Sequence, residues 1–305
     1  MKLINNYIDN INLSSFLFES REIETNSNKQ RRKELEKWLK HKNYDDYVDT
    51  LNKMLEDPKA KALLEDGFGG VLGDTKLIFS YKEIPVSQLM PTQSEIDLNK
   101  SICHALQEKE SLEKTFTDPI LITWPIVTFR KNYVIDGHHT WLQAIALNPE
   151  GKIAAFNYDG DISPIQMLKA VQGTIAAVKA EEDNDNNGSL PSSKVEGPNF
   201  FDKSFDKEKI ENYISDNLNE SLIDDFHKYI KEITDKKTLV EWLTNNLLNI
   251  KANNYPSESA PGRAKMPQTF KGGTDEDDKK TSLPDKEGSA MNKLKDDKFI
   301  KSVTK

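Results

Sequence analysis

The sequence contains a single cysteine, Cys103, among its 305 residues. One cysteine cannot form a disulfide within the chain, so a reducing compartment is expected and packing alone must hold the fold together. Cys103 lies in a run with helical spacing. The interpretation that this position favours is a buried structural thiol.

Long apolar runs are also lacking. The sequence has no stretch of about 18 apolar residues, the minimum for a membrane-spanning helix. Near the N-terminus the apolar residues are interrupted by Asn5, Asn6, Asp9 and Asn10. Neither a membrane span nor a secretory signal is therefore predicted, and we expect a soluble, intracellular protein without a membrane partner.

An excess of basic residues is absent as well. The formal net charge of -8 disfavours nonspecific coating of a polyanion, unless basic residues gather on one face. A hydrophobic content of 36% with 30% charged residues is low for a fully packed chain. The sequence therefore predicts solvated linkers or tails in addition to folded parts.

The middle of the chain, residues 76–180, has the pattern of a small α+β domain. Apolar, β-rich runs predict strands at 82–89, 119–123, 126–129, 133–135 and 152–158. Helical spacing of apolar residues predicts one helix over roughly 98–113 and another that starts at Thr140. Mixed strands and helices of this length favour a small mixed sheet with helices packed on it.

The parts on either side of this domain are predicted to be helical or disordered. The divisions are a helical N-terminal region at 1–75, a flexible linker at 181–199, a helical hairpin at 200–254 and a disordered tail at 255–305. Within the hairpin, Thr238 and Glu241 have the spacing of a capping box.

The most informative run is NYVIDGHHTWLQAIAL, residues 132–147, which reads as a strand, a glycine turn and an amphipathic helix. Backbone amides at a helix N-terminus point outward and the helix dipole adds positive charge, so a phosphate can bind there. Gly137, His138, His139 and Thr140 are the candidate phosphate-binding residues. Asp136, His138 and His139 are candidate catalytic residues, because carboxylates and histidines exchange protons.

Two other interpretations of this run stay open. A metal site would need an irregular loop to bring the adjacent histidines together, and the sequence offers no obvious third and fourth ligand. In a purely structural interpretation, Asp136 caps the helix, the histidines hydrogen-bond to the backbone and Trp141 packs into the core.

A second polar segment lies between the first predicted strand and its helix. Gln93, Glu95 and Asp97 are candidate substrate contacts, because a loop at this point can reach the same pocket as the histidines. The alternative is a helix start, in which the acidic residues complement the helix dipole. Proximity to the histidine loop decides between the two.

The order IPVSQLMPTQSEID, helix, PILIT, YVIDGHHTWLQAIAL resembles the ParB/sulfiredoxin superfamily, in particular the ParB-like nuclease-type domains of tailed bacteriophages. Members of this superfamily hold phosphates at a comparable strand-turn-helix loop. Gly137 matches the loop glycine, and His139 stands where sulfiredoxins carry histidine. Thr140 replaces a phosphate-binding arginine, and His138 replaces the sulfiredoxin cysteine, so sulfinic-acid repair in its known form is excluded.

Three functions are expected in order of preference, and the resemblance implies the first of them. The first is a phage nuclease or nucleotide phosphate-transfer enzyme, with a nucleoside triphosphate and Mg or Mn as expected cofactors. The second is a non-catalytic, virion-associated protein that binds other phage proteins. The third is a DNA-binding regulator that uses the basic helix at 29–42. The resemblance implies a location in the cytoplasm of an infected bacterium or in the virion.

Overall fold

The computed structural model describes residues 78–123, 125–160, 163–165, 167–168, 197–258 and 260–262. The predicted N-terminal helical region, including its basic helix, lies outside the described residues. The same holds for nearly all of the predicted linker and for the tail beyond residue 262.

Five strands form one mixed sheet with the order β1-β5-β3-β4-β2. They are β1 (Ile78–Pro85), β2 (Met90–Pro91), β3 (Ile126–Phe129), β4 (Tyr133–Asp136) and β5 (Lys152–Asp159). The β1/β5 and β3/β4 pairs are antiparallel, whereas β3/β5 and β2/β4 are parallel. With the helices described below, this sheet confirms the α+β character predicted from the sequence.

The central strands are mostly apolar because they are buried on both faces, and the buried polar side chains of Thr128 and Asn157 hydrogen-bond to each other at 3.2 Å. All four residues of β3 and six consecutive residues of β5 are buried, which matches the continuous hydrophobic runs of interior strands. The strand predicted at 119–123 is wrong. Only Ile120 pairs there, in an isolated parallel bridge with Ile153.

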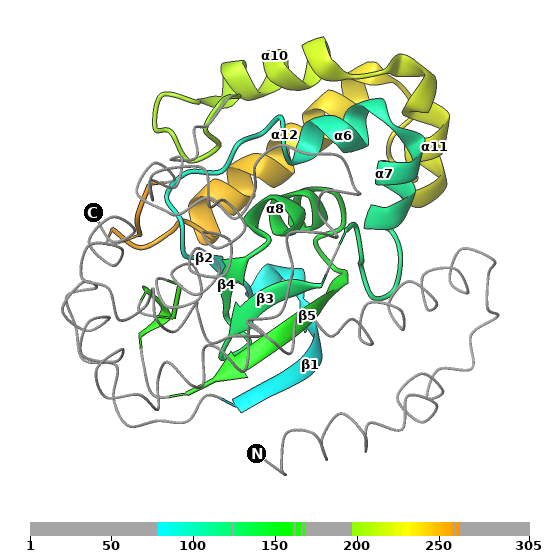
Figure 1. Cartoon of the computed structure of the whole chain (residues 1–305). Helices are drawn as coiled ribbons and strands as arrows, with labels where there is room; N and C mark the ends of the chain where they lie inside the picture. Colours follow the sequence, from blue (N-terminus) through cyan, green and yellow to red (C-terminus); the bar gives the residue numbers. More distant parts are fainter. Residues whose placement is uncertain are drawn as a thin grey trace, which may run out of the picture. The chain divides into compact units, whose positions relative to one another are not determined.

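Six α-helices and two short 3-10 turns are described (Figure 1). They are η1 (Val86–Gln88), α6 (Ile102–Gln107), α7 (Lys109–Thr115), α8 (His138–Leu147), α10 (Lys207–Asn217), η2 (Glu220–Leu222), α11 (Ile223–Tyr229) and α12 (Lys236–Asn253). The single helix predicted over 98–113 is in fact α6 and α7. The extended backbone of Glu108, with φ -125° and ψ 120°, separates them.

Helix α8 lies at the centre of the described structure. It contacts β3 and β4 on one side, and α6, α7 and α12 on the other. Trp141 of this helix is fully buried and donates its indole N–H to the carbonyl of Val86 at 3.2 Å. Loss of such a side chain typically costs about 3–5 kcal/mol, so α8 is a major source of stability.

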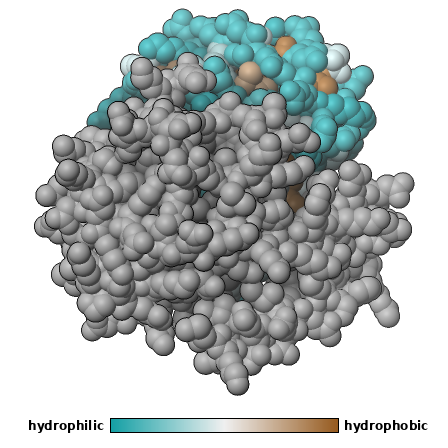
Figure 2. All heavy atoms as spheres, in the orientation of Figure 1, coloured by the Kyte–Doolittle hydropathy of each residue, from teal (hydrophilic) through white to brown (hydrophobic). Residues whose placement is uncertain are grey.

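The C-terminal helices share this core rather than enclosing a second one. Buried side chains of α10 and α12 belong to the same hydrophobic cluster as those of α8. Asn246 in α12 donates to the carbonyl of Ala146 at 2.9 Å, and Asn254 donates to that of Leu89 at 3.0 Å. The outer surface of the described helices is mainly hydrophilic, with scattered hydrophobic spots (Figure 2). None of the helices described is both long and apolar enough to cross a membrane.

Candidate functional site

The candidate loop begins where β4 ends. Asp136 is the last residue of β4, Gly137 is the N-cap of α8, and His138 is the first helical residue. Gly137 has φ 85°, a left-handed conformation, and an added Cβ would lie 2.6 Å from Cγ2 of Ile126. Only glycine combines an unstrained left-handed φ with the absence of a Cβ, so the backbone of this turn can lie close to Ile126. Asp136 precedes the cap, so its interpretation as the capping residue is wrong.

His138 points into the protein and has an exposure of 2%. Its Nε2 accepts a hydrogen bond from the backbone N–H of Thr92 at 3.2 Å. The Thr92 hydroxyl gives its only proton to the carbonyl of Val134 at 2.6 Å. As acceptor of the Thr92 backbone N–H, Nε2 carries no proton and the ring proton lies on Nδ1, whereas the other tautomer would donate its Nε2–H to the Thr92 hydroxyl, 3.3 Å away.

His139 makes a parallel contact from a half-buried position. Its Nε2 accepts a hydrogen bond from the backbone N–H of Asp97 at 3.3 Å. The two histidines together therefore tie the start of α8 to both ends of residues 92–97, which we call the 92–97 loop. The structure brings the two candidate segments into contact, as the substrate-contact interpretation requires.

The three candidate residues of the 92–97 loop differ in their surroundings. The alternative of a helix start fits Asp97 in part: α6 begins at Ile102 and has no acidic residue in its first turn, but the Asp97 carboxylate caps the turn that leads into α6. Asp97 is fully buried, and its carboxylate accepts backbone N–H groups of Asn99, Lys100 and Gly197. That carboxylate therefore acts as a structural anchor.

Gln93 and Glu95 differ from Asp97 in burial and in their surroundings. Gln93 is 5% exposed, and within the described part of the chain its Oε1 accepts no hydrogen bond. Burying an amide oxygen without a hydrogen-bond donor costs free energy, so the Gln93 side chain stays a candidate for contact with a ligand. Glu95 is half-buried and lies against Gly262.

The first turn of α8 has features of an anion site. It contains no acidic residue. The hydroxyl of Thr140 lies 3.4 Å from the hydroxyl of Thr123, and this contact is exposed to solvent. Two hydroxyl groups beside the positive end of a helix dipole are suitable donors to phosphate oxygens.

Sequence reasoning missed Thr92 and Thr123 as members of this site. Thr123 belongs to the PILIT run that carries the family resemblance, and Thr92 immediately follows Pro91 in β2. Their polar side chains at the ends of apolar segments were the available signal. Their partners, Thr140 and His138, are too distant in sequence for spacing to reveal them.

No metal centre is formed by the described residues. Among them, no group of three or more His, Cys, Asp and Glu side chains is arranged to hold a metal ion.

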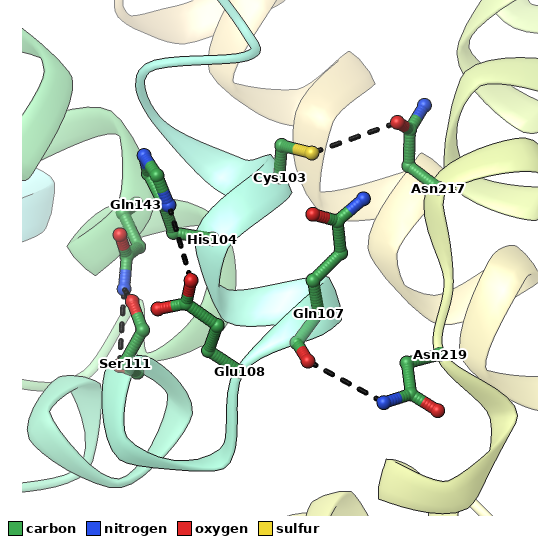
Figure 3. Close-up of polar contacts among 8 residues, drawn as sticks. All are labelled: Cys103, His104, Gln107, Glu108, Ser111, Gln143, Asn217 and Asn219. Atoms are coloured by element: carbon green, nitrogen blue, oxygen red, sulfur yellow. Dashed lines mark hydrogen bonds and ion pairs between the residues drawn. The ribbon is translucent and has the colours of Figure 1, made fainter.

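Cys103 lies in α6 and is part of a different polar network (Figure 3). Its half-buried thiol donates to Oδ1 of Asn217 at 3.5 Å. Burial raises the pKa of the Cys103 thiol, and the carboxylate of Glu108 raises it further, while a hydrogen bond with Tyr213 lowers it. The protonated thiol is a poor nucleophile, which agrees with a structural role.

The same view shows how α6 and α7 are tied to their neighbours (Figure 3). Gln143 of α8 donates to Ser111 of α7, and Asn219 donates to the carbonyl of Gln107. These contacts fix the helices that surround α8.

Comparison with known proteins finds no family model, no curated protein and no solved structure that matches the chain. The resemblance described from the sequence motifs therefore remains a prediction. Function must be argued from the geometry of the loop.

Proposed function

We propose that the protein binds a phosphate-bearing ligand, a nucleotide or a nucleic-acid phosphate, at the loop Asp136–Thr140. The observation that carries the proposal is the start of α8: a left-handed Gly137 places the helix N-terminus at the end of β4, beside the exposed hydroxyls of Thr140 and Thr123. Backbone amides at a helix N-terminus, with hydroxyl donors beside them, favour a phosphate.

In this proposal the fold is a ParB/sulfiredoxin-like domain flanked by helical regions. The protein is then a phage protein that acts in the infected host or in the virion. Thr140 stands where relatives carry a charged, bidentate arginine, and a single hydroxyl replaces it. The proposed site therefore binds a phosphate through backbone amides and hydroxyls, with a cation such as Mg or Mn bound to the ligand.

The histidines have a positioning role in this proposal. His138 is buried and its Nε2 already accepts the Thr92 N–H, so proton exchange at that nitrogen would break the contact. Nuclease or phosphate-transfer activity, which the resemblance implies, would rely on Asp136 and His139, the half-buried ionisable groups of the loop, and would require Nε2 of His139 to release the Asp97 N–H that positions it.

Calorimetry with nucleoside triphosphates, inorganic pyrophosphate and short DNA, with and without Mg or Mn, tests the proposal. Chromatography of the same mixtures detects turnover. Thr140→Val removes the hydroxyl and keeps the shape, and we expect it to weaken phosphate binding about tenfold, the equivalent of one lost hydrogen bond. Thr140→Ser keeps the hydroxyl and should bind like the native protein. The proposal would be contradicted if none of these ligands bound to the protein.

A second candidate function is a non-catalytic scaffold for protein partners. The observation that favours it is that Nε2 of both His138 and His139 accepts a backbone N–H, as a purely structural loop requires. In that case the double variant His138→Ala, His139→Ala loses stability but changes no turnover, because there is none to change.

A further inference from the structure

The short segment Gly197–Phe200, which we call the latch, leads into the C-terminal helices and runs beside the 92–97 loop. Asp97 and Asn199 form an antiparallel bridge. Two backbone hydrogen bonds flank the bridge: Leu98 N–H donates to the Pro198 carbonyl at 3.1 Å, and Phe200 N–H donates to the Ile96 carbonyl at 2.9 Å. The latch is therefore held like a strand along a loop that has no regular structure of its own.

Side chains reinforce this pairing in both directions. Oδ1 of Asn199 accepts the backbone N–H of Ile96 at 3.0 Å and that of Phe201 at 3.2 Å. In return, the buried carboxylate of Asp97 accepts the N–H of Gly197 at 3.0 Å. Gly197 allows this approach because an added Cβ would lie 2.6 Å from Oδ1 of Asp97.

Asp97, the loop residue that pairs with the latch, also hydrogen-bonds to one of the histidines. The N–H of Asp97 donates to Nε2 of His139 at 3.3 Å. His138 is held by Thr92 at the other end of the loop, and the hydrogen bonds of Thr92 go to His138 and Val134. Through these hydrogen bonds the latch is linked to His139 by way of Asp97, whereas those of His138 run to the other end of the loop.

We infer that the latch sets the position of His139, with Asn199 as the positioning residue, and that latch docking is coupled to phosphate binding at the start of α8. The coupling to ligand rests on the proposed function, whereas the positioning of His139 does not. If a ligand binds more tightly when the latch is paired with the 92–97 loop, thermodynamic linkage requires the bound ligand to stabilise that pairing by the same free energy.

The ligand-free full chain tests the positioning. Asn199→Ala removes the acceptor for two backbone amides, and Asn199→Asp keeps it as the matched control. We expect Asn199→Ala to speed hydrogen exchange of the Ile96 and Asp97 amides about tenfold, as for the loss of one hydrogen bond. The ring nitrogen signals of His139 should shift, while those of His138 stay in place. Asn199→Asp should leave both unchanged.

Equal shifts at both histidines, or none at His139, would overturn the inference. Native protein with inorganic pyrophosphate supplies a second measurement that does not depend on how well the variant folds. We expect pyrophosphate to slow exchange of the Leu98, Gly197 and Phe200 amides. Pyrophosphate that binds without slowing them overturns the coupling. If neither pyrophosphate nor any of the nucleotides and DNA binds, the proposed function is refuted, and the ligand-free exchange of Asn199→Ala then still decides the positioning of His139.

Discussion

At the residue scale, Gly137 is a position that tolerates few side chains. Replacement by alanine must pay for a left-handed φ of 85° and for a Cβ placed 2.6 Å from Cγ2 of Ile126. We expect Gly137→Ala to lower the free energy of unfolding by about 2–4 kcal/mol, measured by urea denaturation.

A double-mutant cycle separates the two causes at Gly137. Ile126→Ala removes the atom that the new methyl group meets, so the combined variant should be less destabilised than the sum of the single ones. A Gly137→Ala variant as stable as the native protein would show that the turn does not need its left-handed conformation.

The buried His138 carries a second prediction at this scale. Because Nε2 accepts the N–H of Thr92, we expect nitrogen NMR to show a neutral ring with the proton on Nδ1. Thr92→Pro removes the donor and should change the ring signals. A ring protonated on Nε2 in the native protein would contradict the described hydrogen bond.

At the element scale, the start of α12 shows how a local pattern can be recognised but misplaced. The sequence suggested a capping box of Thr238 with Glu241. The helix in fact begins at Lys236, with Asp235 as the N-cap and Thr238 as the reciprocal partner of the box. Both pairs have the same spacing, and the local pattern alone does not distinguish them.

Asp235 makes the stability of α12 depend on pH. The backbone N–H of Thr238 hydrogen-bonds to its carboxylate and is the largest cause that lowers the pKa of Asp235 below its ordinary value of 3.8. A depressed pKa in the folded state means that the contribution to stability is full above pH 3.8 and is lost as the pH falls through the folded pKa.

We therefore expect Asp235→Ala to have a lower Tm than the native protein at pH 6, and the difference to shrink below pH 3.8. Thermal unfolding followed by circular dichroism between pH 2 and pH 6, a range set about the ordinary carboxyl pKa, measures both effects. Asp235→Asn keeps an acceptor without a titrating group, and its Tm at pH 6 should lie between those of the native protein and Asp235→Ala. A Tm difference that stays constant with pH would contradict the capping contact.

At the scale of the whole molecule, one hydrophobic core joins the sheet, α8 and the C-terminal helices. The division into a domain at 76–180 and a separate hairpin at 200–254 remains a prediction, and a core substitution tests it. Leu243 of α12 is fully buried, and Leu243→Ala should cost about 2–5 kcal/mol.

A shared core also predicts how that loss is distributed. We expect amide exchange of β5 and of α10 to accelerate together in Leu243→Ala, with a single unfolding transition. Asn245→Ala, on the exposed face of the same helix, serves as the control and should have little effect. Acceleration confined to the helices would instead show that the C-terminal part unfolds by itself.

The sequence by itself determined the elements whose signals are local: the strand, glycine turn and helix over 133–147, and the α+β character of the middle of the chain. Periodicity and turn chemistry act over two to four residues, and these features are encoded at that range. Only the tertiary structure decided what surrounds the candidate loop. Thr92 meets His138 across 46 positions and Asp97 meets His139 across 42, so no local spacing records either contact. The sequence left the histidines open as acid-base groups or as groups that hydrogen-bond to the backbone, and the tertiary structure gives Nε2 of each a backbone N–H to accept.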